Sequence, residues 1–143
     1  MGTDYAKIAE EAIGQPVEAA GLFEPSGSQY SSRYGGNAAG GILTGLAKHS
    51  DRGKAAADLP WRMIIGVTDS QIYVFEAKEK IGHFEIETPA LFVLDRGSTT
   101  AEKHVGGVAA EGLSLTAPDG TRVEVEAQRV AGHGTDVIKL LVG

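Results

Sequence analysis

Histidine, carboxylate and hydroxyl side chains are the groups in this chain that could carry chemistry, because the sequence contains no cysteine. The four histidines are His49, His83, His104 and His133. No two of them show the spacing of roughly three to five residues that places metal ligands on one helix turn or in a zinc finger. The spacing therefore predicts no metal site built from neighbouring residues.

One small group combines imidazole with carboxylates. His83, Glu85 and Glu87 alternate along a predicted strand, so their side chains share one face of it. They could form a carboxylate–imidazole cluster, but a solvated strand face is the favoured interpretation.

Three sequence patterns that mark catalytic or nucleotide-binding loops are absent among the glycines and serines. The serine-rich stretch between residues 25 and 33 lacks the Gly-x-Ser-x-Gly turn that exposes a nucleophile. Gly41–Gly45 is not followed by the lysine of a phosphate-binding loop, and Gly132-His133-Gly134 is too short to be a dinucleotide-binding turn. The sequence thus predicts no catalytic residue, no metal ligand and no cofactor, and it favours a non-enzymatic protein over an enzyme.

Length and composition indicate a single domain over residues 1–143. Hydrophobic residues make up 42% of the chain and charged residues 22%, which is enough apolar material for a core. The net charge of −6 and the lack of a basic cluster argue against nucleic acid as a partner. With no signal peptide and no apolar run of about 20 residues, we expect cytoplasmic localisation, and association with a membrane is disfavoured.

The first 58 residues are predicted to form a helical, Gly-rich N-terminal extension. A helix is expected over residues 4–13, capped by Thr3 or Asp4 and ended by Gly14, and a strand over residues 17–23.

The Gly-rich stretch at residues 34–48 is the least usual part of the chain. A helix is favoured here over a loop, although each glycine costs a helix about 1 kcal/mol relative to alanine. Close packing against the rest of the chain would offset this cost. Self-association through small side chains is the functional alternative. That possible interface comprises Gly36, Gly40, Gly41, Ile42, Leu43, Gly45 and Leu46.

Residues 59–143 are predicted to form antiparallel hairpins followed by a C-terminal helix. The expected strands cover residues 61–68, 71–77, 81–88, 90–95, 99–105, 112–116 and 122–127. The expected turns are Asp69-Ser70, Lys78-Glu79-Lys80 and Pro118-Asp119-Gly120, and Pro89 is expected to end a strand.

The last two predicted elements should bury apolar side chains. In the last strand Val123, Val125 and Ala127 should be buried, and Glu124, Glu126 and Gln128 should face solvent. The final helix, over residues 134–142, would be capped by Thr135 or Asp136, with a strand as the competing assignment. Val137, Ile138, Leu141 and Val142 would form its apolar stripe.

The first of these hairpins carries a resemblance. The phrase Ile65-Gly66-Val67-Thr68-Asp69-Ser70-Gln71-Ile72-Tyr73-Val74-Phe75 resembles the early hairpin of pleckstrin-homology-like and GRAM-like domains. The chain is also similar to small uncharacterised actinobacterial proteins in which a Gly-rich segment precedes such a hairpin and an Asp-Arg pair, here Asp95-Arg96, follows it. The resemblance covers about residues 59–143. It implies a bent antiparallel sheet or partly open barrel closed by a C-terminal helix, in a non-enzymatic binding module for proteins or lipids.

Three functional hypotheses follow from these observations. The first is a non-catalytic module that binds a protein partner or self-associates through residues 36–46. The second is a small-ligand-binding protein or small enzyme with a site in the mouth of the barrel, lined by Trp61, Arg62, Tyr73 and His83. The third is peripheral lipid binding through residues 52–54 with Lys78 and Lys80.

Overall fold

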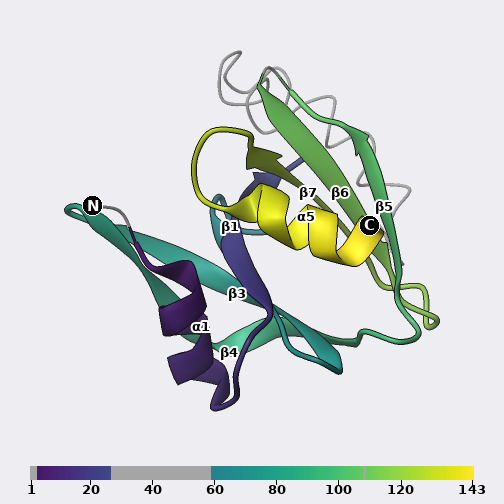
Figure 1. Ribbon diagram of the computed structural model, residues 1–143, viewed down its shortest axis with the longest axis horizontal. Coiled ribbons are helices and arrows are strands. Elements are labelled where there is room, and N and C mark those ends of the chain that lie inside the picture. The colour runs from purple at the N-terminus through teal and green to yellow at the C-terminus, as the bar shows by residue number, and fades with distance from the viewer. Residues whose placement is uncertain (1–2, 27–58, 108) are drawn as a thin grey trace.

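The structure is a computed structural model that describes residues 3–26, 59–107 and 109–143. In these residues it contains the helices α1 (Tyr5–Ile13) and α5 (Gly134–Val142). The strands are β1 (Ala19–Pro25), β2 (Met63–Val67), β3 (Gln71–Lys80), β4 (His83–Asp95), β5 (Thr100–Val105), β6 (Ala110–Thr116) and β7 (Arg122–Gln128). They form one antiparallel open sheet in the order β4-β3-β2-β1-β7-β6-β5 (Figure 1). The predicted α+β class and antiparallel sheet are therefore confirmed.

Strand β1 joins the two halves of the sheet. It pairs with β2 from Ala19 to Phe23, and within the described residues it pairs with β7 only through Glu24 and Pro25. Because β1 belongs to the stretch expected to be an N-terminal extension, the division at residue 58 is not reflected in the sheet. The strand predicted over residues 17–23 exists, shifted by two residues towards the C-terminus.

Helix α1 has the capping residues that the sequence predicts. The Asp4 carboxylate accepts a hydrogen bond of 3.1 Å from the Lys7 N–H, and Gly14 ends the helix at a φ of 86°. Tyr5 and Ala9 are buried against one face of the half of the sheet that β1 to β4 form. There they belong to a small apolar cluster that includes Ala20. Such a short helix depends on this packing, because isolated helices of its length are marginal in water.

The main core lies on the other face of the sheet, beneath α5. Val137 and Ile138 of α5 pack there with residues from both halves of the sheet. The fully buried side chains contributed by the strands include Phe23, Met63, Ile65, Val67, Ile72, Val74, Leu113, Leu115, Val123 and Val125. The predicted C-terminal helix therefore closes one side of the sheet, and the competing strand assignment is wrong.

The start of α5 lies almost in backbone contact with β1. A Cβ atom at Gly21 would be 2.5 Å from the Gly134 backbone nitrogen, and one at Gly134 would overlap the side chain of Ala127. Next to this contact, the Leu22 N–H donates a 2.8 Å hydrogen bond to the Gly132 carbonyl. Glycines at both positions therefore allow α5 to approach β1 this closely.

The turn predicted at Lys78-Glu79-Lys80 is wrong. Those residues belong to β3, where Lys78 pairs with Glu85 and Lys80 with His83. The chain reverses instead at Ile81 and Gly82, and Gly82 has a φ of 82°. A glycine adopts this left-handed conformation without steric cost, so it sets the position of the turn.

The prediction that Pro89 ends a strand is also wrong, since β4 runs through it. The pairing with β3 shifts register there: Val74 lies opposite Phe92, whereas Glu76 lies opposite Glu87. Proline is tolerated because β4 is an edge strand and the register shift is a bulge, so no ladder hydrogen bond requires its missing N–H.

Two details of the last strand and helix differ from expectation. Glu126 is only 4% exposed and accepts a 3.3 Å hydrogen bond from the Gly107 N–H, so this face of β7 is not fully solvated. The N-cap of α5 is His133, whose side chain makes no capping bond, in place of Thr135 or Asp136. The φ of 60° at His133 turns the chain into the helix two residues before Thr135 and three before Asp136.

The predictions for residues 34–48 lie outside the described residues. The possible interface of Gly36, Gly40, Gly41, Ile42, Leu43, Gly45 and Leu46 falls in the same stretch. Within the part of the chain that the structure describes, no helix has the length and apolar character needed to cross a membrane.

Replacing Gly21 with alanine tests the contact between β1 and α5. The added methyl group would meet the Gly134 backbone, which cannot rotate away, so we expect the free energy of unfolding to fall by about 1–3 kcal/mol. Urea denaturation measures this change. Gly97→Ala is the matched control, because its methyl group would make an ordinary 3.5 Å contact with the Asp95 side chain. Equal stabilities of the two variants would contradict the proposed close packing.

Candidate functional site

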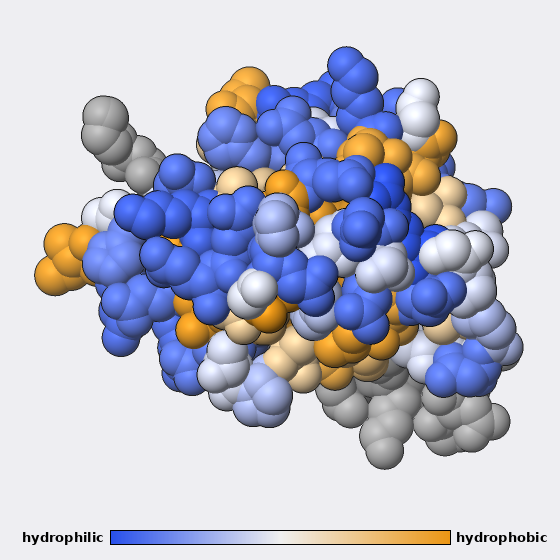
Figure 2. Space-filling model, turned by 60° about the horizontal axis from the view of Figure 1, so that its bottom comes forward, coloured by the Kyte–Doolittle hydropathy of each residue, from blue (hydrophilic) through white to orange (hydrophobic). Residues whose placement is uncertain are grey.

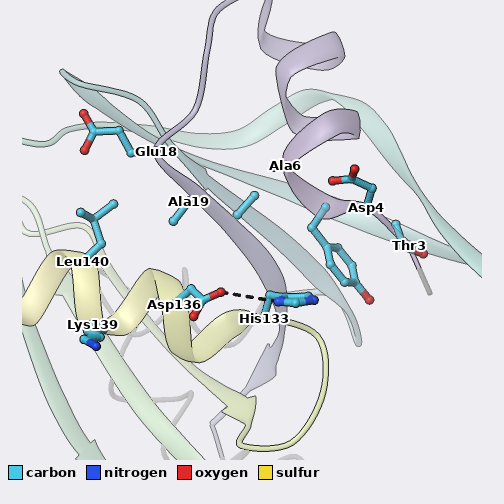
Figure 3. Close-up of a pocket in the computed structure, with 11 residues that line it drawn as sticks. Thr3, Asp4, Ala6, Glu18, Ala19, His133, Asp136, Lys139 and Leu140 are labelled. Atoms are coloured by element: carbon cyan, nitrogen blue, oxygen red, sulfur yellow. Dashed lines mark ion pairs between the residues drawn. The ribbon is translucent and has the colours of Figure 1, made fainter. Parts of the chain in front are cut away.

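A cleft lies between α1 and α5, with β1 as its floor (Figure 3). Its volume is about 590 Å³. It is lined by Thr3, Asp4, Tyr5, Ala6, Glu18, Ala19, Ala20, His133, Asp136, Lys139 and Leu140. We call it the α1–α5 cleft. Glu18 and Leu140 lie towards one end in Figure 3, and Thr3 and Asp4 towards the other.

Small side chains create this space. Ala6 on α1 and Ala19 and Ala20 on β1 contribute only methyl groups to the walls and floor. The close approach of Gly21 and Gly134 fixes the position at which α5 begins. It therefore sets the distance between α1 and the first turn of α5. The cleft is therefore a consequence of how the two termini of the chain pack on one strand.

The carboxylates of the cleft already have partners within the chain. Glu18 accepts a 3.0 Å hydrogen bond from Arg96, whose guanidinium also donates to the Thr68 carbonyl at 2.7 Å. Asp136 lies 3.5 Å from the Nδ1 atom of His133, as the dashed line in Figure 3 marks. Asp4 caps α1. Each of these carboxylates therefore already has a contact within the chain.

The pair of His133 and Asp136 has the composition of an acid–base dyad but not its surroundings. Both side chains are about two-thirds exposed, at 67% and 66%. No hydroxyl group of the described residues hydrogen-bonds to the His133 ring, so no nucleophile is aligned with it. The nearest aromatic partner is Tyr5, with ring centroids 6.1 Å apart. This arrangement supports binding better than it supports proton transfer.

Tyr5 connects the cleft with the small apolar cluster beneath α1. It is 7% exposed, and its ring also lies 6.5 Å from that of Phe84. Burial raises the pKa of the Tyr5 hydroxyl above its ordinary value, and a hydrogen bond with Thr3 opposes this effect. The hydroxyl is therefore held neutral where it borders the cleft.

The four residues predicted to line a barrel mouth lie apart. Trp61 contacts Arg62, whose Cζ atom is 5.4 Å from the indole centroid and whose Nη1 atom is 3.9 Å from Glu24. Tyr73 is paired with Gly66 near the start of β3, where it stacks on Phe75 with ring centroids 6.0 Å apart. The Arg62 carbonyl accepts a hydrogen bond from the Ala77 N–H, four residues further along β3, so the β2–β3 register separates Tyr73 from Arg62.

His83, the fourth of these residues, lies beside the β3–β4 turn. Its Nε2 atom is 3.1 Å from Glu85, and both side chains are exposed. This agrees with the solvated-face interpretation of His83, Glu85 and Glu87. His83 also borders a smaller hollow of about 190 Å³, next to Thr3 and Tyr5.

The cleft itself was not predicted from the sequence. Its residues come from positions 3–6, 18–20 and 133–140, which no local pattern connects. Two signals could have indicated it: the run Ala19-Ala20-Gly21 of small residues inside a strand, and Gly132-His133-Gly134 directly before the final helix. Both mark places where another part of the backbone approaches closely.

Comparison with known proteins adds no further assignment. The chain matches no protein-family model, no curated protein and no solved structure.

The buried hydroxyl of Tyr5 predicts a specific loss of stability in alkali. In the unfolded chain Tyr5 ionises near its ordinary pKa of about 10, whereas in the folded chain its raised pKa keeps it neutral. Its contribution is thus fully present below about pH 10 and is lost as the pH rises through the raised folded pKa. Urea denaturation between about pH 8 and 11 should show a steeper decline for the native protein than for Tyr5→Phe. Parallel declines would show that Tyr5 ionises equally easily in both states.

Proposed function

We propose that this protein is a non-catalytic, pleckstrin-homology-like module that binds a segment of a partner protein in the α1–α5 cleft. The observation that carries the proposal is the cleft itself: about 590 Å³, with a floor of alanine methyl groups and a rim of charged groups. Binding sites for ligands commonly combine an apolar lining with a few polar groups in this way.

The architecture supports the pleckstrin-homology-like part of the proposal. Hairpin-connected antiparallel strands surround a core that a C-terminal helix covers on one side, which is the arrangement that the hairpin resemblance implies. The cleft lies where the two halves of the sheet diverge at β1.

The small size of the exposed apolar areas favours a partner that binds reversibly over a permanent one. The face in Figure 2 is mostly hydrophilic, and apolar residues occupy small, separate areas of it. The most exposed aliphatic side chains among the described residues, Ile81, Val105 and Val130, come from three separate places: the β3–β4 turn, the end of β5 and the connection from β7 to α5. Permanent partners usually require a large continuous apolar surface.

A displayed library of random peptides provides the probe. We expect selected peptides to bind the full chain and to shift the backbone NMR signals of cleft residues. Ala6→Leu would narrow the cleft without disturbing the helix, since leucine is a good helix former, and should weaken binding at least about tenfold.

Glu11→Leu is the matched control, because it places the same side chain at an exposed position of α1. Its affinity should stay within about twofold of the native value. The proposal fails if no peptide binds with a dissociation constant below about 1 mM. It also fails if the shifted signals lie elsewhere or if Ala6→Leu binds as tightly as the control.

A further inference from the structure

One residue in the floor of the cleft has backbone groups that the sheet does not use. In an antiparallel sheet, successive residues direct their N–H and C=O groups to opposite sides of the strand. The bonds from Thr68 N–H to Gln71 and from Ala77 N–H to Arg62 show that the even-numbered residues of β2 bond to β3. Gly66, the β2 residue opposite Ala20, is therefore engaged with β3. Consequently, Ala20 does not bond to β2.

The other side of β1 is open at the same residue. Leu22, two residues further on, points its N–H away from β2 and donates it to the Gly132 carbonyl. Strand β7 reaches β1 only at Glu24 and Pro25, and after Gln128 the chain turns away towards α5. Among the described residues, the N–H and C=O of Ala20 thus have no backbone partner. They face the α1–α5 cleft, although Ala20 is only 5% exposed.

We propose that the α1–α5 cleft binds an extended peptide segment that pairs with β1 at Ala20 as an added strand; this rests on the proposed function. A backbone N–H and C=O in a nearly buried position favour a partner that supplies both an acceptor and a donor. A peptide main chain supplies both at the spacing of a sheet. The Gly132 carbonyl already makes this kind of bond with Leu22, so the added segment would continue an existing row.

The neighbouring residues limit the length and the side chains of the segment. At one end of this edge of β1, the Leu22 N–H is already bonded to the Gly132 carbonyl. At the other end, the Glu18 N–H donates a 2.7 Å hydrogen bond to the Val67 carbonyl. Between these two positions only Ala20 remains, which suits a paired stretch of about three residues. Side chains of an added strand alternate between the two faces of the sheet, towards Ala6 on one side and Leu140 on the other. We therefore expect small, apolar side chains in the paired stretch.

Hydrogen exchange of the backbone amides tests this pairing in the full chain. The probe is the tightest peptide selected from the displayed random library. We expect the exchange of the Ala20 amide to slow by at least about tenfold when the peptide is present in saturating amount. The amide of Gly21 serves as the internal control, because it lies between Ala20 and Leu22 in β1, faces β2 and should show little change.

A second measurement examines the peptide main chain. N-methylation at each peptide residue in turn should weaken binding at least about tenfold at alternate positions only, since alternate N–H groups face β1. Binding in the cleft without protection of Ala20, or with no alternation, would overturn the added strand and leave the proposed function standing. Failure of every library peptide to bind the cleft would overturn both.

Discussion

The contact between Gly21 and Gly134 is the constraint on which the rest of this structure depends. Two backbones meet there without side chains between them, which brings the start of α5 directly onto the central strand. From this position Val137 and Ile138 reach the core shared by both halves of the sheet. The same contact leaves His133 beside Tyr5, at the end of the space between the two helices. Packing of the core and formation of the cleft are thus two results of one close approach.

The division of the sheet at β1 likewise affects both the packing of the core and the formation of the cleft. β1 pairs with β2 from Ala19 to Phe23 but shares only its last two residues with β7, because the chain after β7 must leave the sheet to begin α5. This departure opens the space that α5 then partly fills. It also leaves backbone groups of Ala20 facing the cleft. A feature required for closing the core therefore also creates the position at which we propose that another chain binds.

Local predictions were accurate where one residue type determines the conformation. The Asp4 cap, the Gly14 stop, the Asp69-Ser70 turn and the Pro118-Asp119-Gly120 turn all occur as expected. The local predictions were wrong where the conformation or the burial of a residue depends on a neighbouring strand. Pro89 does not interrupt β4, since the edge of the sheet and a bulge accommodate it. Glu126 is buried although its alternation with valines indicated solvent, because burial depends on what covers that face of the sheet.

By itself the sequence determined the class of the fold, the hairpin order from β2 to β7 and the final helix. Each of these follows from hydrophobic alternation and turn residues that act over a few positions. Only the tertiary structure placed β1 at the centre of the sheet and brought residues 3–6, 18–20 and 133–140 to one cleft. Nothing local connects those three segments. They meet because α1 and α5 bury their apolar faces on opposite sides of the same strand, and this packing exists only once the whole sheet has formed.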